Sequence, residues 1–264
     1  MRTPGPGDRM RRPAPRNDDA DPVPGPLAPT VLAPAALVAT MFGAQAVTHR
    51  TDAPWSPWLI AAVAAAATAA AVESGLSTEE LGLDPHALGR GLGWSAGVAA
   101  TTAAGIAAGL AIPRVRGLFR NEDYPDLPGA LRAALAEIPL RTVLPEEMLF
   151  RGVLLGLLLR TYPAQTAVPV QAALFGLWHV AGSLDLAAAS PGIGDAVGRG
   201  RAGRALGAAG AVVFTGAAGI VFGRLRVGTG GLAPAVALHW AANGAGAVAS
   251  ALAWRRHAAT RHPG

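Results

Sequence analysis

The sequence of 264 residues contains no cysteine, and reading along it finds no lysine, so all 22 basic residues are arginine. The absence of cysteine excludes disulfides, thiolate zinc sites and cysteine nucleophiles. The absence of lysine excludes Schiff-base and Ser-Lys mechanisms. Any chemistry in this chain therefore rests mainly on carboxylate, imidazole and amide groups.

Charge and aromatic side chains are also scarce. Charged residues make up 15% of the chain and aromatic residues 5%, whereas a soluble domain usually carries about a quarter charged residues. The hydrophobic share is 51%, with 34 glycines and a mean hydropathy of +0.34. This composition argues against an ordinary soluble enzyme and against disorder over most of the chain. Small residues let helices approach closely inside a membrane.

The basic excess is modest. The formal net charge is +5, from 22 basic and 17 acidic residues. An arginine-only chain rich in Ala, Gly and Pro indicates a GC-rich bacterial genome. Arginines at the flanks of apolar runs and in the two tails account for the balance, so no nucleic-acid partner is expected.

Apolar runs follow one another along the chain. They lie at about 30–48, 55–73, 91–112, 145–160, 164–183, 205–223 and 229–253. About 20 helical residues cross a hydrocarbon core of about 30 Å, and the runs are too long for barrel strands and lack their alternation. We predict an all-α, polytopic transmembrane bundle of six to eight spans over residues 30–254, with an intramembrane catalytic cavity, in the cell membrane of a bacterium.

The ends and connectors are polar. Residues 1–29, rich in Pro and Arg, predict a disordered tail rather than a cleaved signal peptide, and 255–264 a polar C-terminal tail. An amphipathic helix is expected from about 128 to 144, and a Gly-rich loop over 184–204. Five arginines in the first 16 residues favour a cytoplasmic N-terminus, but a later arginine cluster at 114–120 opposes it, so the orientation stays open.

The run at 145–160 begins with three charged residues: Glu146, Glu147 and Arg151. A charge at mid-membrane costs about 2.5–3.5 kcal/mol on insertion scales. Glu147 and Arg151 lie on one helix face and can pair, which leaves Glu146 as the carboxylate available as a base. Alternatively, the two acids simply follow Pro145 at a helix N-terminus, although this does not explain an arginine one turn deeper.

Two later runs carry histidines with partners four residues away. Phe175 and His179 share one helix face, as do His239 and Asn243. Each pair also has a simpler interpretation, as a packed histidine or as an asparagine that joins helices by hydrogen bonds. The remaining histidines lie in connectors or in the arginine-rich tail: His49, His86, His257 and His262.

Taken together, these residues indicate a polar cavity, because ionisable groups within apolar helices cluster. A carboxylate or imidazole can remove a proton from water, while imidazole and amide groups can stabilise an oxyanion. Alternatively, Glu146, His179 and His239 could bind a divalent metal such as zinc, with an open position for water. Both arrangements predict hydrolysis.

The three motifs resemble those of the CPBP intramembrane proteases, the family of CAAX proteases and bacteriocin-processing enzymes also called Abi. The segment from Glu146 to Arg151 resembles E-E-x-x-x-R, the segment from Phe175 to His179 resembles F-x-x-x-H, and the segment from His239 to Asn243 resembles H-x-x-x-N. The motifs occur in the family's order, and the resemblance covers about 125–250. It places the catalytic core at about 128–250.

The resemblance implies a CAAX-prenyl-protease-like endopeptidase that uses an activated water on a membrane-associated peptide or protein substrate within the lipid bilayer. By resemblance, Glu146 is the general base and His179 helps to hold the water. His239 and Asn243 stabilise the oxyanion, and Glu147 and Arg151 support the site. Family members have been described both as metalloproteases and as glutamate-type proteases, and the sequence does not decide between them.

Two other functions stay open at this point. One is a non-catalytic membrane scaffold or bacteriocin self-immunity protein of the same fold. The other is a small transporter or channel subunit with a proton relay, although the sequence shows no obvious internal repeat.

Overall fold

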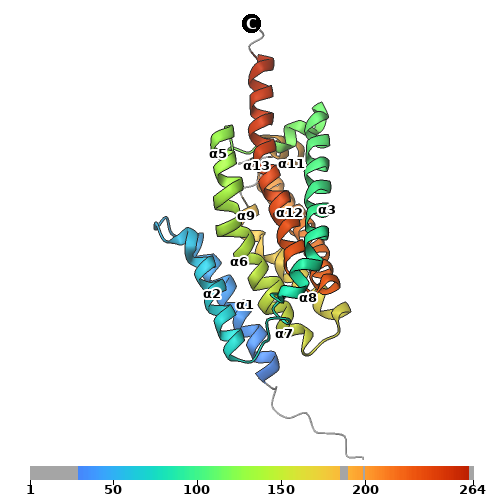
Figure 1. Cartoon of the computed structure of the whole chain (residues 1–264). Coiled ribbons are helices and arrows are strands. Elements are labelled where there is room, and N and C mark those ends of the chain that lie inside the picture. The colour runs from blue at the N-terminus through green and yellow to red at the C-terminus, as the bar shows by residue number, and fades with distance from the viewer. Residues whose placement is uncertain (1–28, 185–189, 199, 262–264) are drawn as a thin grey trace, which may run out of the picture.

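We analysed a computed structural model of the chain, which describes residues 29–184, 190–198 and 200–261. Its described part is helical and contains no strand, which confirms the all-α class. The tail predicted for residues 1–29 lies outside the described residues, apart from Pro29, which begins the first helix. Figure 1 shows the helices gathered in one elongated bundle.

The N-terminal half contains three long helices. They are α1 (Pro29–Thr48), α2 (Ser56–Glu73) and α3 (Pro85–Ala111). Helices α1 and α2 form a hairpin at one side of the bundle (Figure 1). Asp84 caps α3 by accepting hydrogen bonds from the backbone N–H groups of residues 86 and 87. Short α4 (Pro113–Arg116) and η1 (Gly117–Phe119) follow α3.

One unbroken helical segment then runs from residue 127 to residue 159. It comprises α5 (Leu127–Arg132), η2 (Ala133–Val143), α6 (Leu144–Glu147), η3 (Met148–Leu154) and α7 (Leu155–Leu159). The amphipathic helix and the apolar run predicted separately here are therefore continuous. Two parts, η2 and η3, are π-helical, a widened form that often occurs at functional sites. Pro139 lies within η2, and a proline cannot donate the regular helical hydrogen bond.

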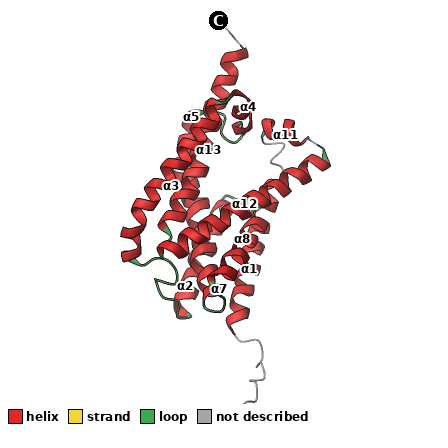
Figure 2. Ribbon diagram, turned by 90° about the vertical axis from the view of Figure 1, so that its right-hand side faces the viewer, coloured by secondary structure: helices red, strands yellow, loops and turns green. Residues whose placement is uncertain are grey.

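The C-terminal half supplies the remaining walls of the bundle. It contains α8 (Ala164–Trp178), α9 (Val180–Ser183), α11 (Pro191–Val197), α12 (Arg201–Thr229) and α13 (Ala233–Arg261). Helix α13 packs along α3, and α12 packs along α8. Figure 2 shows α12 crossing the bundle obliquely, with α13 extending beyond it.

Two boundaries differ from the sequence prediction. The segment 184–204 was expected to be a loop, but α11 lies within it and α12 begins at Arg201. Ser190 precedes Pro191 in extended conformation, and a proline is well tolerated in the first turn of a helix. Helix α13 continues to Arg261, so most of the segment predicted as a polar tail from 255 onwards is helical.

Three described helices are long and apolar enough to cross a membrane: Ser56–Glu73, Gly93–Ala111 and Arg201–Thr229. The stretch Ala33–Thr48 is apolar but shorter. Six to eight spans were expected from the sequence. The α8 run, for example, forms a helix of 15 residues, shorter than the roughly 20 residues that cross a bilayer upright. The larger span number therefore stays a prediction.

Candidate active site

Two adjacent carboxylates of α6 lie at the centre of the site. Glu146 and Glu147 are both buried, and Arg151, one turn further on, is fully buried. Glu147 Oε1 accepts a hydrogen bond from Arg151 Nη1 at 3.0 Å and one from His239 Nδ1 at 2.8 Å. The pairing of Glu147 with Arg151 is thus as the helical spacing predicts, and the bond from His239 joins α6 to α13.

The carboxylate of Glu146 has two unlike oxygen atoms. Oε1 accepts a hydrogen bond from the indole Nε1 of Trp178 at 3.0 Å. Oε2 is buried and makes no hydrogen bond within the described residues. It lies 4.0 Å from Nε2 of His179 and 4.0 Å from Nε2 of His239. One oxygen is held and the other faces both imidazoles.

The hydrogen bonds of the two histidines fix their orientation. His179 Nδ1 lies 2.8 Å from the backbone oxygen of Phe175, and His239 Nδ1 bonds to Glu147. A carbonyl and a carboxylate oxygen can only accept, so each Nδ1 carries the proton. In the neutral imidazoles both Nε2 atoms are therefore acceptors. Three acceptor atoms converge, a set that only a donor such as water, or a cation, can satisfy.

Arg151 lies between aromatic rings behind the carboxylates. Its guanidinium carbon is 4.0 Å from the ring centre of Phe175 and 4.7 Å from that of Phe222. Cation–π attraction of this kind strengthens when the cation is removed from water. Phe222 also stacks on the His239 ring, with centroids 5.3 Å apart. The aromatic residues thus hold the ion pair and one histidine in place.

These groups open onto a cavity of about 590 Å³. Glu146, Phe175, His179, His239 and Asn243 all line it. Glu147 and Arg151 lie behind this wall, where they contact the lining residues. Every site residue predicted from the sequence is therefore at the cavity or directly behind it. Polar side chains from other elements complete the lining: Gln45, Thr102, Thr142 and Thr215.

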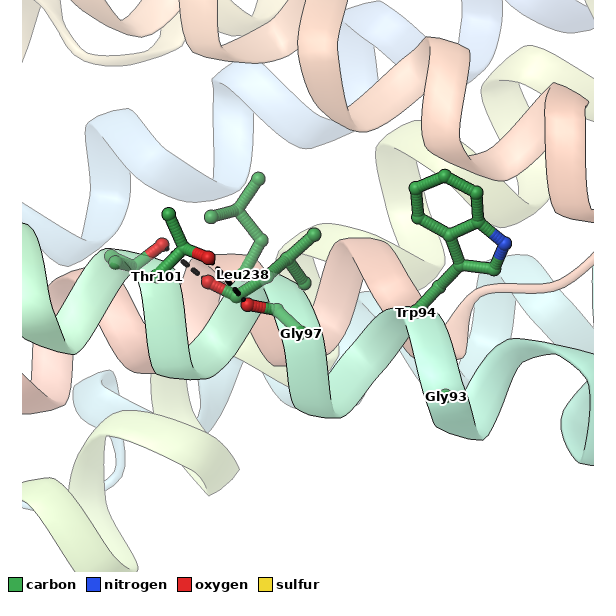
Figure 3. Close-up of a pocket in the computed structure, with 7 residues that line it drawn as sticks. Gly93, Trp94, Gly97, Thr101 and Leu238 are labelled. Atoms are coloured by element: carbon green, nitrogen blue, oxygen red, sulfur yellow. Dashed lines mark hydrogen bonds between the residues drawn. The ribbon is translucent and has the colours of Figure 1, made fainter.

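A second hollow of about 710 Å³ adjoins this cavity along α3. Figure 3 shows Trp94, Gly97 and Thr101 following one another along its wall, with Leu238 of α13 facing them. Thr102 and Leu238 line both hollows, so the two are neighbours. The α3 groove, which is the hollow lined by residues 93–102 and Leu238, thus lies beside the cavity that contains Glu146.

Glu146, His179 and His239 are the residues of the site that could bind a metal ion. Histidine nitrogen and carboxylate oxygen are normal zinc ligands, and the three converging acceptors are of these types. Over the described ranges, however, no three His, Cys, Asp or Glu side chains form a group that could hold a metal. The arrangement does not fit a preformed metal site, and the chemistry below uses only groups of the protein.

Three residues near the carboxylates were not singled out from the sequence: Gln45, Trp178 and Phe222. Trp178 immediately precedes His179, so its position in the motif was visible while its bond to Glu146 was not. Gln45 donates through Nε2 to the backbone oxygen of Trp178 at 2.7 Å. No spacing rule reveals this contact, because the two residues are 133 positions apart.

Comparison with known proteins places these motifs in one family. Residues 130–245 match the family model described as type II CAAX prenyl endopeptidase Rce1-like. The match spans all three motifs and confirms the resemblance seen in the sequence. Neither the curated proteins nor the solved structures include a significant match to the chain. Over residues 130–245, which contain all three motifs, this chain is therefore similar to the Rce1-like type II CAAX prenyl endopeptidases.

Proposed function

We propose that the protein is an intramembrane endopeptidase that hydrolyses a peptide bond of a membrane-associated substrate with a water activated by Glu146. The observation that carries the proposal is the placement of Glu146 Oε2, which is buried, has no donor among the described residues and lies 4.0 Å from both Nε2 atoms. A gap of 4.0 Å is too long for a direct hydrogen bond. A water about 2.8 Å from each end can bridge it.

The reaction follows from the acceptor and donor groups at the cavity. Glu146 Oε2 takes a proton from water while the water oxygen adds to the carbonyl carbon, and His179 Nε2 holds the second water proton. The oxyanion forms beside Asn243, whose amide can donate. His239 can donate to the oxyanion from Nε2 when that nitrogen carries a proton, and its Nδ1 bond to Glu147 orients the ring. Glu146 then returns its proton to the leaving amine as the carbon–nitrogen bond breaks.

The cavity lining indicates the kind of substrate. Its walls are largely apolar, as are those of the neighbouring α3 groove, which reaches Trp94, a side chain that is 61% exposed. An apolar peptide segment, or a peptide with a lipid anchor, would bury its surface there. We accordingly place the enzyme in a bacterial cell membrane as a multi-pass protein.

The test uses the full chain in phospholipid vesicles with an internally quenched, lipid-anchored peptide. Glu146→Gln should lower turnover by about 10²–10⁴-fold, the usual contribution of a general base. The matched control is Glu137→Gln, which removes two partly exposed ion pairs, with Arg132 and Arg141, and should leave turnover unchanged. Wild-type turnover by Glu146→Gln would reject the base role. If the wild-type protein cleaves none of a set of peptides of varied sequence, the scaffold or self-immunity function is favoured.

A metal-assisted form of the same hydrolysis has one observation in its favour, the convergence of three acceptors that a cation could satisfy. It is distinguished by stripping divalent metals from the vesicle-bound protein and measuring both metal content and turnover. Undiminished turnover in the metal-free protein supports the protein-only reaction. Turnover that is lost and then restored by zinc would support a metalloprotease, with Glu146, His179 and His239 as ligands.

A further inference from the structure

Trp178 occupies the end of α8 and is almost fully buried. Its ring packs edge-on against Phe42 of α1 and Phe150 of η3, with centroids 5.7 and 5.6 Å apart. These contacts fix the ring on two sides, so the indole N–H points in one direction only. That direction is Glu146, with a distance of 3.0 Å between Nε1 and Oε1.

The chemistry of the indole makes this contact directional. An indole N–H donates a hydrogen bond and cannot accept one. Oε1 of Glu146 is therefore always the acceptor of this bond. The proton taken from water must then go to Oε2, the oxygen that faces His179 and His239.

A second contact secures Trp178 from outside the matched family domain. Helix α8 ends at Trp178 and α9 begins only at Val180. Carbonyl groups at a helix end lack their helical partners, and Gln45 of α1 supplies one for the Trp178 oxygen, at 2.7 Å. Phe42, which packs on the ring, lies three residues before Gln45 on the same face of α1. Helix α1 lies outside residues 130–245.

We infer that Trp178 is a positioning residue for catalysis: its indole N–H holds one oxygen of Glu146 so that the other faces both histidines, and α1 holds Trp178 through Gln45 and Phe42. The inference rests on the proposed function, because it takes Glu146 as the base. It predicts that the site is incomplete without α1.

The test removes only the N–H group. Replacing Trp178 by 3-benzothienylalanine, in which sulfur stands in place of N–H, keeps the size and shape of the ring. We expect kcat to fall by about 10–10²-fold, since small misplacements of reacting groups cost this much, with KM within about twofold. Trp178→Phe should likewise lower kcat and leave KM nearly unchanged.

A matched control is Trp254→Phe, because Trp254 also donates an indole hydrogen bond of 3.0 Å, to the backbone oxygen of Asn121. This variant should keep wild-type kcat. Gln45→Leu should lower kcat by about 3–10-fold, the usual effect of one lost hydrogen bond. Adding Trp178→Phe to Glu146→Gln should cause no further loss, because both changes act on the same group.

The outcomes separate the two claims. Wild-type turnover by Glu146→Gln overturns the proposed function. An inactive Glu146→Gln together with a benzothienyl variant that retains wild-type kcat overturns the role of Trp178 alone. A variant that changes KM while kcat is unchanged also overturns it, because a positioning residue for the base acts on the chemical step. The role of Trp178 is likewise overturned if Trp178→Phe lowers kcat by the same factor in the Glu146→Gln background as in the wild type.

Discussion

His239 donates a hydrogen bond of 2.8 Å from Nδ1 to Oε1 of Glu147 and so joins α13 to α6 through two residues that are 92 positions apart in the chain. The same oxygen accepts from Arg151. Glu147 therefore has two tasks, since it orients one imidazole of the site and neutralises a guanidinium that has no access to water. Its neighbour Glu146 has neither task, although the two stand side by side in the sequence.

Glu147→Gln should destabilise the protein much more than Glu146→Gln. Loss of the carboxylate leaves the buried Arg151 without its hydrogen-bonded partner, and breaking a buried ion pair in this way typically costs about 3–5 kcal/mol. Glu146→Gln leaves the ion pair intact and should change unfolding little. The measurement is denaturant or thermal unfolding of both variants in the same detergent.

A double variant separates stability from activity at this position. Glu147→Gln with Arg151→Met removes both members of the buried pair, which is often neutral for stability. Stability should return towards that of the wild type, while turnover should stay low because His239 has lost its carboxylate. Equal stability of Glu147→Gln and the wild type would contradict the expected cost of breaking the buried ion pair.

Gly176→Ala should destabilise the contact between α8 and α12. A Cβ at this position would lie 2.7 Å from the backbone oxygen of Val212, so the helices would have to separate. Overpacking of this kind costs about 1–3 kcal/mol. Turnover should fall as well, since His179 follows three residues later. Gly210→Ala is the control, because no atom lies within 4 Å of its Cβ and alanine favours a helix. Unfolding of both variants in detergent, together with turnover, checks this, and equal stability would count against close packing here.

Acid should weaken the link between the α2–α3 connector and the end of α7. A hydrogen bond from Arg160 and one from the Ser77 backbone lower the pKa of Glu80 from 4.5 to about 2. A lowered carboxyl pKa stabilises the fold fully above pH 4.5, and this contribution is lost as pH falls towards 2. The effect should be small, because the ion pair is partly exposed.

The check is the unfolding temperature between pH 6 and pH 2. Glu80→Gln should show a smaller decline across this range than the wild type. Glu79→Gln, a change in the exposed neighbouring side chain, should keep the wild-type decline. Identical declines in all three proteins would exclude a contribution from the Glu80–Arg160 pair.

Helical periodicity explains how much of the site the sequence predicted. A spacing of four residues places Glu147 with Arg151, Phe175 with His179, and His239 with Asn243 on common helix faces. These six residues could thus be assigned, with Glu146, to one site before the helices were placed, and four of the six line the cavity together with Glu146. The same periodicity could not show that residues 127–159 form a single helical segment, because Pro145 was interpreted as the start of a separate apolar run.

The sequence by itself determined the class of the protein, an all-α membrane bundle with carboxylate, imidazole and amide chemistry, because composition and local spacing are properties of the chain alone. Only the tertiary structure decided which oxygen of Glu146 is unpaired, since this depends on Trp178 and through it on Gln45. It also decided that Phe222 and Phe175 enclose Arg151. Such contacts join side chains from separate helices, and their geometry is set by packing, which no local pattern encodes.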